Sequence, residues 1–170
     1  MKKTVTILTV LLVIAGAIVI GILANRKPVV LSREYTFPGA TWNKTNLVYL
    51  SYEVPEKFVG KTFSMYMEMT YSPSIRRNSI RMDITAFSPE GDERTAEYTL
   101  FLKDAEGKFK GEVSGNSISM KQLMRNNYVF SQPGIWKFEL DQRSELYDFA
   151  GLETMRLIFE ETPEGKNKNE

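Results

Sequence analysis

The 170-residue sequence contains no cysteine and no histidine. Without thiol groups the chain cannot form disulfides or thiolate metal sites. Without imidazole it lacks the base of serine–histidine and cysteine–histidine catalysis, and the commonest zinc ligand. Asp141 and Glu145 are the carboxylates worth weighing as a glycosidase pair, but we interpret them as solvated residues at a strand end and in the following loop. We therefore predict that the chain is not an enzyme and uses no cofactor or metal.

The sequence also lacks an excess of charge of either sign. It has 22 lysines and arginines against 21 aspartates and glutamates, and without Lys2 and Lys3 the basic count falls to 20. A nucleic-acid-binding stripe requires a marked excess of cations, because affinity for the phosphate backbone comes from charge neutralisation. We therefore expect no nucleic-acid partner.

The N-terminus carries a long uncharged run. Residues 4–24 contain no charged side chain and follow the basic start Met1–Lys3. A helix of about 20 apolar residues crosses the hydrocarbon core of a bilayer, whereas the apolar part of a cleavable signal is about 7–15 residues long. Ala24 is a possible cleavage point, although Ile22 is a poor partner for it. We predict that residues 1–24 form an uncleaved transmembrane signal anchor that holds the chain in the membrane, with cleavage as the alternative.

The orientation of this segment follows from its short N-terminal tail. Basic residues flank both ends of the apolar run, so the positive-inside rule gives little preference. Because the leading tail is only a signal-like stub, we predict a single-pass protein. Its C-terminal domain is exported, to the periplasmic or cell-surface side of the cell membrane.

The remaining chain divides into three parts. Residues 25–34 are predicted to be a juxtamembrane linker in which Pro28 stops the helix, although residues 29–35 are also an edge-strand candidate. Residues 35–161 are predicted to form one β-sandwich domain. The polar residues 162–170 are predicted to be a disordered tail.

The domain shows a hydrophobic period of two, which is typical of β-strands. In residues 63–70, Phe63 and three methionines alternate with polar residues. Further alternating or apolar runs cover residues 48–54, 80–86, 96–102, 136–141 and 155–160, and Pro and Gly turn signals separate them. The pattern predicts an all-β fold, an antiparallel β-sandwich that is jelly-roll-like, with about eight strands.

One short helix is also predicted, over Ser119–Arg125. Ser119 is a suitable N-cap, and Met120, Leu123 and Met124 would form an apolar side.

The inward positions of the predicted strands identify the core. Each member of the set alternates with polar neighbours and shares a face with other apolar residues: Met65, Met67, Ile84, Leu100, Trp136, Phe138 and Leu157.

Four residues are candidates for a binding surface. Arg76, Arg77 and Arg81 could recognise an acidic partner or an anionic glycan, or could lie solvated on the outer face of a strand and its entry loop. Trp42 follows a Pro-Gly turn in a polar stretch and could stack on a sugar ring, or could plug one end of the sandwich.

Residues 104–111 contain Asp104, Glu106 and Gly107 in an arrangement that faintly resembles a calcium loop. An EF-hand needs at least five positioned oxygen ligands, which this spacing does not supply. We predict a hairpin connection without metal, in which Gly107 takes a positive φ.

Several segments, taken in order, resemble one known family. They are Phe37–Trp42, Ser88–Gly91, Leu102–Gly111, Phe130–Leu140, Gln142–Arg143 and Leu152–Phe159. The most distinctive is FSQPGIWKFEL at Phe130–Leu140, where a Pro-Gly turn opens an aromatic strand. Over residues 35–160 the order of these features is similar to that of the gliding-motility lipoprotein GldH family.

The resemblance implies a non-catalytic accessory protein of the cell envelope that is associated with gliding motility and acts by contact with other envelope proteins. A glycan-binding β-sandwich module is the alternative. Family members carry an acylated cysteine after the signal, whereas here Ala24 is followed by Asn25. Lipid attachment at that position is therefore not possible, and the apolar run is predicted to replace it.

Overall fold

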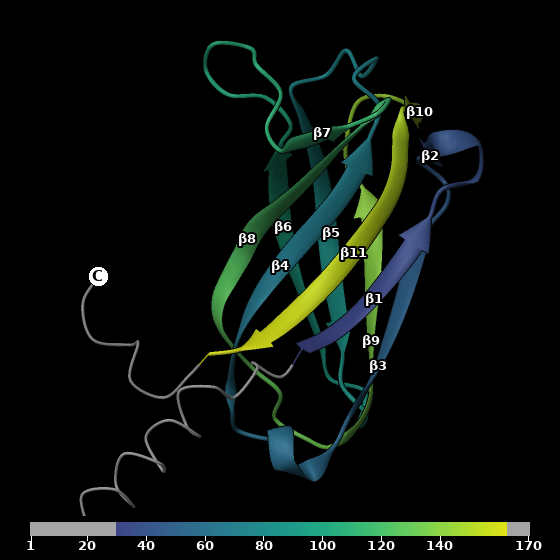
Figure 1. The fold of residues 1–170 in the computed structure, drawn as a ribbon. Helices are drawn as coiled ribbons and strands as arrows, with labels where there is room; N and C mark the ends of the chain where they lie inside the picture. The colour runs from purple at the N-terminus through teal and green to yellow at the C-terminus, as the bar shows by residue number, and fades with distance from the viewer. Residues whose placement is uncertain (1–29, 163–170) are drawn as a thin grey trace, which may run out of the picture.

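The computed structural model describes residues 30–162, which fold into eleven strands and two 3-10 turns (Figure 1). In chain order these are β1 (Val30–Thr36), η1 (Pro38–Ala40), β2 (Thr41–Asn43), β3 (Val48–Val54), η2 (Glu56–Phe58), β4 (Thr62–Tyr71), β5 (Ser79–Phe87), β6 (Glu93–Phe101), β7 (Glu112–Ser114), β8 (Ser117–Val129), β9 (Gly134–Gln142), β10 (Asp148–Ala150) and β11 (Leu152–Glu161).

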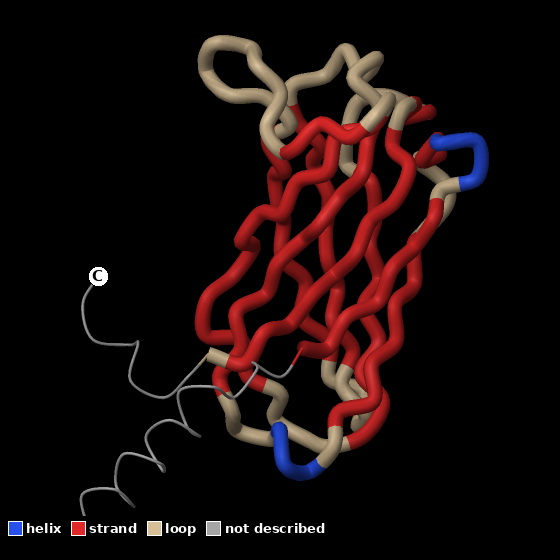
Figure 2. Tube along the Cα trace, viewed as in Figure 1, coloured by secondary structure: helices blue, strands red, loops and turns tan. Residues whose placement is uncertain are grey.

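The strands form two main sheets that pack face to face, with loops gathered at the two ends (Figure 2). One sheet has the order β1-β11-β4-β8-β7 and the other the order β3-β9-β5-β6, and β2 pairs with β10 at one end. All the pairings are antiparallel. Without the three-residue strands β2, β7 and β10, this order of eight strands is that of a jelly roll. The prediction of an all-β antiparallel sandwich is confirmed.

The domain begins earlier than the sequence indicated. Strand β1 starts at Val30 and pairs with β11 along its whole length, from Val30 opposite Glu160 to Thr36 opposite Thr154. Residues 30–34 are therefore part of an edge strand and not of a linker, because their backbone groups continue the ladder of β11. The predicted anchor at 1–24 and the tail at 163–170 lie outside the described residues. No helix within residues 30–162 has the length and hydrophobicity to cross a membrane.

The predicted helix at Ser119–Arg125 is wrong, because these residues belong to β8. The strand pairs with β4, so that Met120 faces Met69 and Leu123 faces Tyr66. Apolar residues at 120, 123 and 124 fit a helical period, but in the strand Met120 and Met124 pack toward the core whereas Leu123 is 43% exposed. A β-bulge against β4 interrupts the regular alternation here. Pairing with the long neighbouring strand decides the conformation.

The core lies between the two sheets and contains every residue predicted for it, from Met65 in β4 to Leu157 in β11. At its centre the Phe159 ring of β11 packs against four aromatic rings from both sheets. The centroid distances are 5.3 Å to Tyr52, 5.0 Å to Tyr128, 5.1 Å to Phe130 and 5.1 Å to Phe138. The contacts are edge-on or tilted, which are favoured arrangements of aromatic rings.

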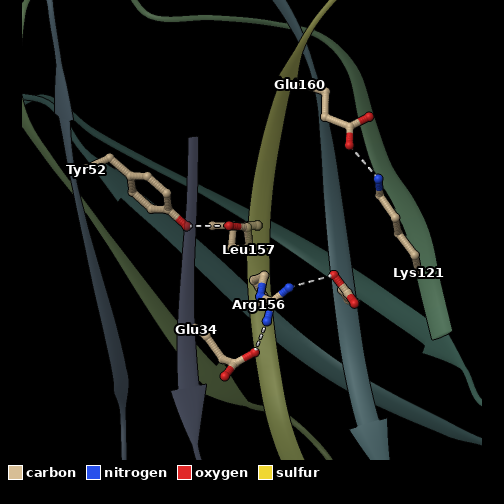
Figure 3. Close-up of polar contacts among 7 residues, drawn as sticks. Glu34, Tyr52, Lys121, Arg156, Leu157 and Glu160 are labelled. Atoms are coloured by element: carbon tan, nitrogen blue, oxygen red, sulfur yellow. Dashed lines mark hydrogen bonds and ion pairs between the residues drawn. The ribbon is translucent and has the colours of Figure 1, made fainter. Parts of the chain in front are cut away.

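Two kinds of polar contact accompany this core (Figure 3). Inside, the Tyr52 hydroxyl of β3 donates to the Leu157 carbonyl of β11 at 2.6 Å, and so joins the two sheets. On the outer face, Arg156 lies between Glu34 and Glu68 on the flanking strands. Such partly exposed ion pairs contribute little to stability, so the buried hydrogen bond matters more.

The Trp136 side chain should be a large contributor to stability. It is 7% exposed, packs 5.3 Å from Phe130 and donates its Nε1–H to the Gln132 carbonyl at 3.0 Å. We expect Trp136→Ala to lower the free energy of unfolding by about 3–5 kcal/mol in urea titrations. The matched control is Ile135→Ala on the same strand, where the side chain is 58% exposed and the change should stay within about 0.5 kcal/mol. Equal midpoints for the two variants would contradict this.

The Tyr52 hydroxyl should make stability depend on pH in the alkaline range. Burial raises the pKa of Tyr52 above its ordinary value of 10.0, so the folded chain keeps the proton where the unfolded chain releases it. The contribution is full below about pH 10 and falls as the pH rises further. Tyr52→Phe should cost about 1–3 kcal/mol at neutral pH, because the Leu157 carbonyl loses its partner. Its stability should also fall less steeply than that of the unaltered chain above about pH 10, and parallel curves would refute the assignment.

Candidate functional site

Trp42 is not a surface platform. Its side chain is 1% exposed, packs against Phe37 at a centroid distance of 5.3 Å, and donates Nε1–H to the Asn46 carbonyl at 2.8 Å. Strand β2 places it directly opposite Phe149 of β10. The alternative interpretation, that this tryptophan plugs one end of the sandwich, is the correct one, because the β2–β10 pair folds over the end of the core.

The three candidate arginines, in contrast, are brought together at that same end of the molecule. They line a surface hollow with a cavity volume of about 350 Å³. Its other walls come from the start of β5 and from the loop between β9 and β10. The lining residues are Arg76, Arg77, Asn78, Ser79, Arg81, Ser144, Glu145, Leu146 and Phe149.

A second hollow of about 560 Å³ adjoins the first and shares Arg76, Arg77, Leu146 and Phe149 with it. Its remaining walls include Ile75, Asp148 and Ala150. The two arginines of the β4–β5 loop therefore stand between a more polar hollow on one side and one with more apolar walls on the other.

The β4–β5 loop that carries Arg76 and Arg77 is held by short backbone contacts. The Ser72 amide donates to the Gly151 carbonyl at 2.7 Å, and the Ile75 amide to the Ser72 carbonyl at 3.1 Å. Gly151 has a φ of +92°, and a Cβ there would lie 2.6 Å from Cγ1 of Ile75. Glycine is required at this position because the buried Ile75 side chain approaches the backbone so closely.

The facing loop between β9 and β10 is fixed by polar contacts. Lys44 donates from its Nζ to the Ser144 carbonyl at 3.0 Å and from its amide to the Tyr147 carbonyl at 2.7 Å. The buried Gln142 side chain accepts from Ser144 Oγ at 2.8 Å and donates to the Trp42 carbonyl at 2.8 Å. Trp42 therefore supports the site from below without lining it.

The arginines of the hollow carry uncompensated charge. Within residues 30–162, no hydrogen bond or ion pair with another described residue engages the side chains of Arg76, Arg77 or Arg81. The neighbouring carboxylates Asp83 and Asp141 are bound by Arg143, at 3.2 Å and 3.3 Å. The first hollow thus presents three guanidinium groups against a single acidic lining residue, Glu145.

Two of the acidic residues considered for catalysis and calcium have other partners. Asp141 pairs with Arg143, and Asp104 Oδ1 accepts the backbone N–H groups of Glu106 at 3.1 Å and Lys108 at 2.8 Å. Gly107 has a φ of +79°, as predicted for this turn. Across the described part of the chain, no three acidic side chains cluster in a way that would hold a metal ion.

Part of the site could not be found in the sequence. Leu146 and Phe149 complete the hollow together with Glu145, which the sequence offered only as a catalytic candidate. All three follow Arg81 by more than 60 residues and form no recognisable motif with it. Nothing in the sequence around Gln142 indicates that its side chain is 1% exposed and donates a hydrogen bond to the Trp42 carbonyl. Only the pairing of β5 with β9, which sets Met82 opposite Gln142, brings these segments together.

The solved structures that resemble this fold share little sequence with the chain. One is a carbohydrate-binding module specific for non-crystalline cellulose, with 10% identity, a TM-score of 0.41, and coverage of 77% of this chain and 75% of that one. Another is dimeric latent PorU from Porphyromonas gingivalis, with 8% identity, a TM-score of 0.37, and coverage of 80% and 13%. A third is the mitogen derived from Yersinia pseudotuberculosis, with 7% identity, a TM-score of 0.33, and coverage of 85% and 92%. At these TM-scores the likenesses carry no functional argument.

The family comparison is decisive where the structural ones are not. No curated protein matches the chain. A sequence model of the GldH lipoprotein family matches residues 29–155, which run from the residue before β1 into β11 and take in both hollows. The chain therefore belongs to the GldH lipoprotein family.

Proposed function

We propose that the chain is a non-catalytic accessory protein of the cell envelope that serves gliding motility by binding other envelope proteins. The observation that carries this proposal is the family match over residues 29–155, which spans nearly the whole sandwich. The geometry supports it as well: the site at the β2–β10 end presents charged groups suited to binding a surface.

The same proposal includes a membrane tether. The GldH lipoprotein family points to an envelope protein that is associated with a membrane. This sequence has no cysteine to accept a lipid, so we assign attachment to the apolar residues 4–24. In this arrangement the chain crosses the cell membrane once and the sandwich is exported. An apolar helix of this length holds a protein in the bilayer far more durably than one acyl chain does.

Glycan binding is the competing function. Its main support, Trp42 as a stacking platform, is removed by the burial of that side chain. Tyr49 on β3 and Tyr147 in the β9–β10 loop are 61% and 60% exposed, and they remain available as aromatic contacts. A glycan array run beside the protein-binding experiment separates the two functions.

The protein-binding function can be tested by cross-linking in cells of the source organism, followed by purification of the tagged full chain in mild detergent. We expect a small set of envelope proteins to be retained in constant ratio to the chain. The matched control carries residues 1–29 fused to an unrelated β-sandwich and should lose that set, because it keeps only the anchor. Retention of the same proteins by both, together with specific binding on the glycan array, would overturn the proposal in favour of glycan recognition.

The tether is tested by fractionation and N-terminal sequencing. We expect the protein to stay with membranes in high salt and in alkaline carbonate, and its sequence to begin at Met1, since burial of about 20 apolar residues is effectively irreversible in water. A mature chain that begins at Asn25 and appears in the soluble periplasmic fraction would show that the segment is a cleaved signal.

A further inference from the structure

We propose that Arg76, Arg77 and Arg81 form a binding site for carboxylates on an acidic segment of a partner protein. This inference rests on the proposed protein-binding function and specifies the chemistry of the partner. The shared wall of the two hollows, formed by Arg76 and Arg77, is the centre of the site.

The first argument is electrostatic. Three arginines line one hollow, and the guanidinium group of arginine is a cation. Like charges that line one hollow repel one another, and Glu145 is the one acidic residue among the lining residues of the first hollow. Arg143, the first residue after β9, shows the alternative arrangement, since two carboxylates already neutralise it. A carboxylate that enters the hollow would form ion pairs with the three arginines, as Asp83 and Asp141 do with Arg143.

The second argument concerns the geometry of the donors. Each guanidinium is a planar fork that can hold one carboxylate through two parallel N–H···O bonds. Arg76 and Arg77 stand on the β4–β5 loop, whereas Arg81 stands on the outer face of β5. The forks therefore come from two segments of backbone, and the loop is held by the close contact of Ile75 with Gly151. Such a site suits more than one carboxylate, as an acidic peptide offers.

The third argument separates a peptide from an acidic sugar. Carbohydrate sites usually present the flat face of an aromatic ring, but the aromatic residue that lines these hollows, Phe149, is 1% exposed. Leu146, Ile75 and Ala150 give the second hollow apolar walls without a stacking surface. A peptide in which acidic and small apolar side chains are adjacent would fill the polar and the apolar hollow together.

The position of the site is compatible with a tethered protein. The hollows lie at the end of the sandwich that carries β2 and β10, whereas β1 begins at the other end (Figure 1). Val30 lies six strand steps before Thr36, which corresponds to about 20 Å along β1 at about 3.3 Å per residue. A membrane segment ahead of Val30 would therefore join the sandwich at the end away from the arginines, and leave them accessible to a partner.

Two lining residues carry the same charge as the proposed ligand, Glu145 in the first hollow and Asp148 in the second. The Asp148 carboxylate accepts a hydrogen bond from Asn43 at 2.8 Å, so Glu145 is the residue that tests the charge of the ligand. Glu145 places a carboxylate in the first hollow beside the arginines. If the ligand is anionic, Glu145→Gln should tighten binding, because a repulsive charge is removed. A purely structural role for the arginines would not produce this gain.

The experiment measures binding of a fluorescent oligoglutamate peptide to the full chain in neutral detergent by anisotropy. We expect Arg76→Gln/Arg77→Gln/Arg81→Gln to weaken binding about tenfold or more, since three charge contacts are lost together. Glu145→Gln should strengthen it about twofold to fivefold. Higher salt should weaken binding to the unaltered chain more than binding to the triple variant.

The matched control removes the same charge elsewhere. Lys57, Arg94 and Lys137 are exposed residues outside both hollows, and the last two lie beside Ala86 and Phe87, at the far end of β5. Lys57→Gln/Arg94→Gln/Lys137→Gln should leave affinity within about twofold, and melting curves confirm that both triple variants fold. Equal losses of affinity in the two triple variants would show that the peptide binds through the overall charge of the domain and not at the hollow. This result would overturn the proposal.

Two further probes decide the ligand class. An oligoglutamine peptide should not bind, since it lacks the charge. Tight binding of oligogalacturonate without binding of oligoglutamate would overturn the peptide assignment in favour of an acidic glycan.

Failure of this site and failure of the proposed function give different results. Cross-linked partners that survive the arginine triple variant would refute this site and leave protein binding intact. Oligoglutamate binding in a chain that retains no partner protein in cells would instead support the site and count against the proposed function.

Discussion

The fold depends on the packing of one ring, that of Phe159, between the two sheets. Strand β11 lies inside its own sheet, between β1 and β4, and its Phe159 meets Phe138 and Tyr52 of the opposite sheet and Tyr128 of its own. Apolar burial is non-directional, so by itself it would allow the layers to slide. Edge-on ring contacts and the hydrogen bond from Tyr52 to the Leu157 carbonyl fix one register between them.

The two packed sheets are joined by loops that gather at the two ends of the sandwich (Figure 2). At the β2–β10 end, Trp42 and Phe149 close the core, and Gln142 fixes the tryptophan backbone. This closure supports the β9–β10 loop that faces the arginines. Binding residues generally occur on loops that a rigid scaffold carries. Here the buried Trp42 and Phe149 lie at the same end of the sandwich as the hollow that the arginines line.

The chain belongs to the GldH lipoprotein family, yet its sequence contains no cysteine. The sandwich keeps the pattern of the family across residues 29–155, so its binding role can be proposed from that match. The sequence contains no cysteine, the residue through which the family resemblance implies lipid attachment. Under the proposed tether, the apolar residues 4–24 would attach the chain to the membrane in place of a lipid.

The sequence by itself determined most of the long strands and the core residues predicted from them, because alternation of apolar residues is a local property of the chain. Val30–Thr36 was an open choice between linker and strand, and Ser119–Arg125 was mistaken for a helix, since only pairing with β11 and β4 decides them. The arginines were found from the sequence, Glu145 was weighed only as a catalytic candidate, and Phe149 was not found. Tertiary structure alone decided that these residues share a hollow and that Trp42 does not, because contacts between distant strands leave no trace in local sequence.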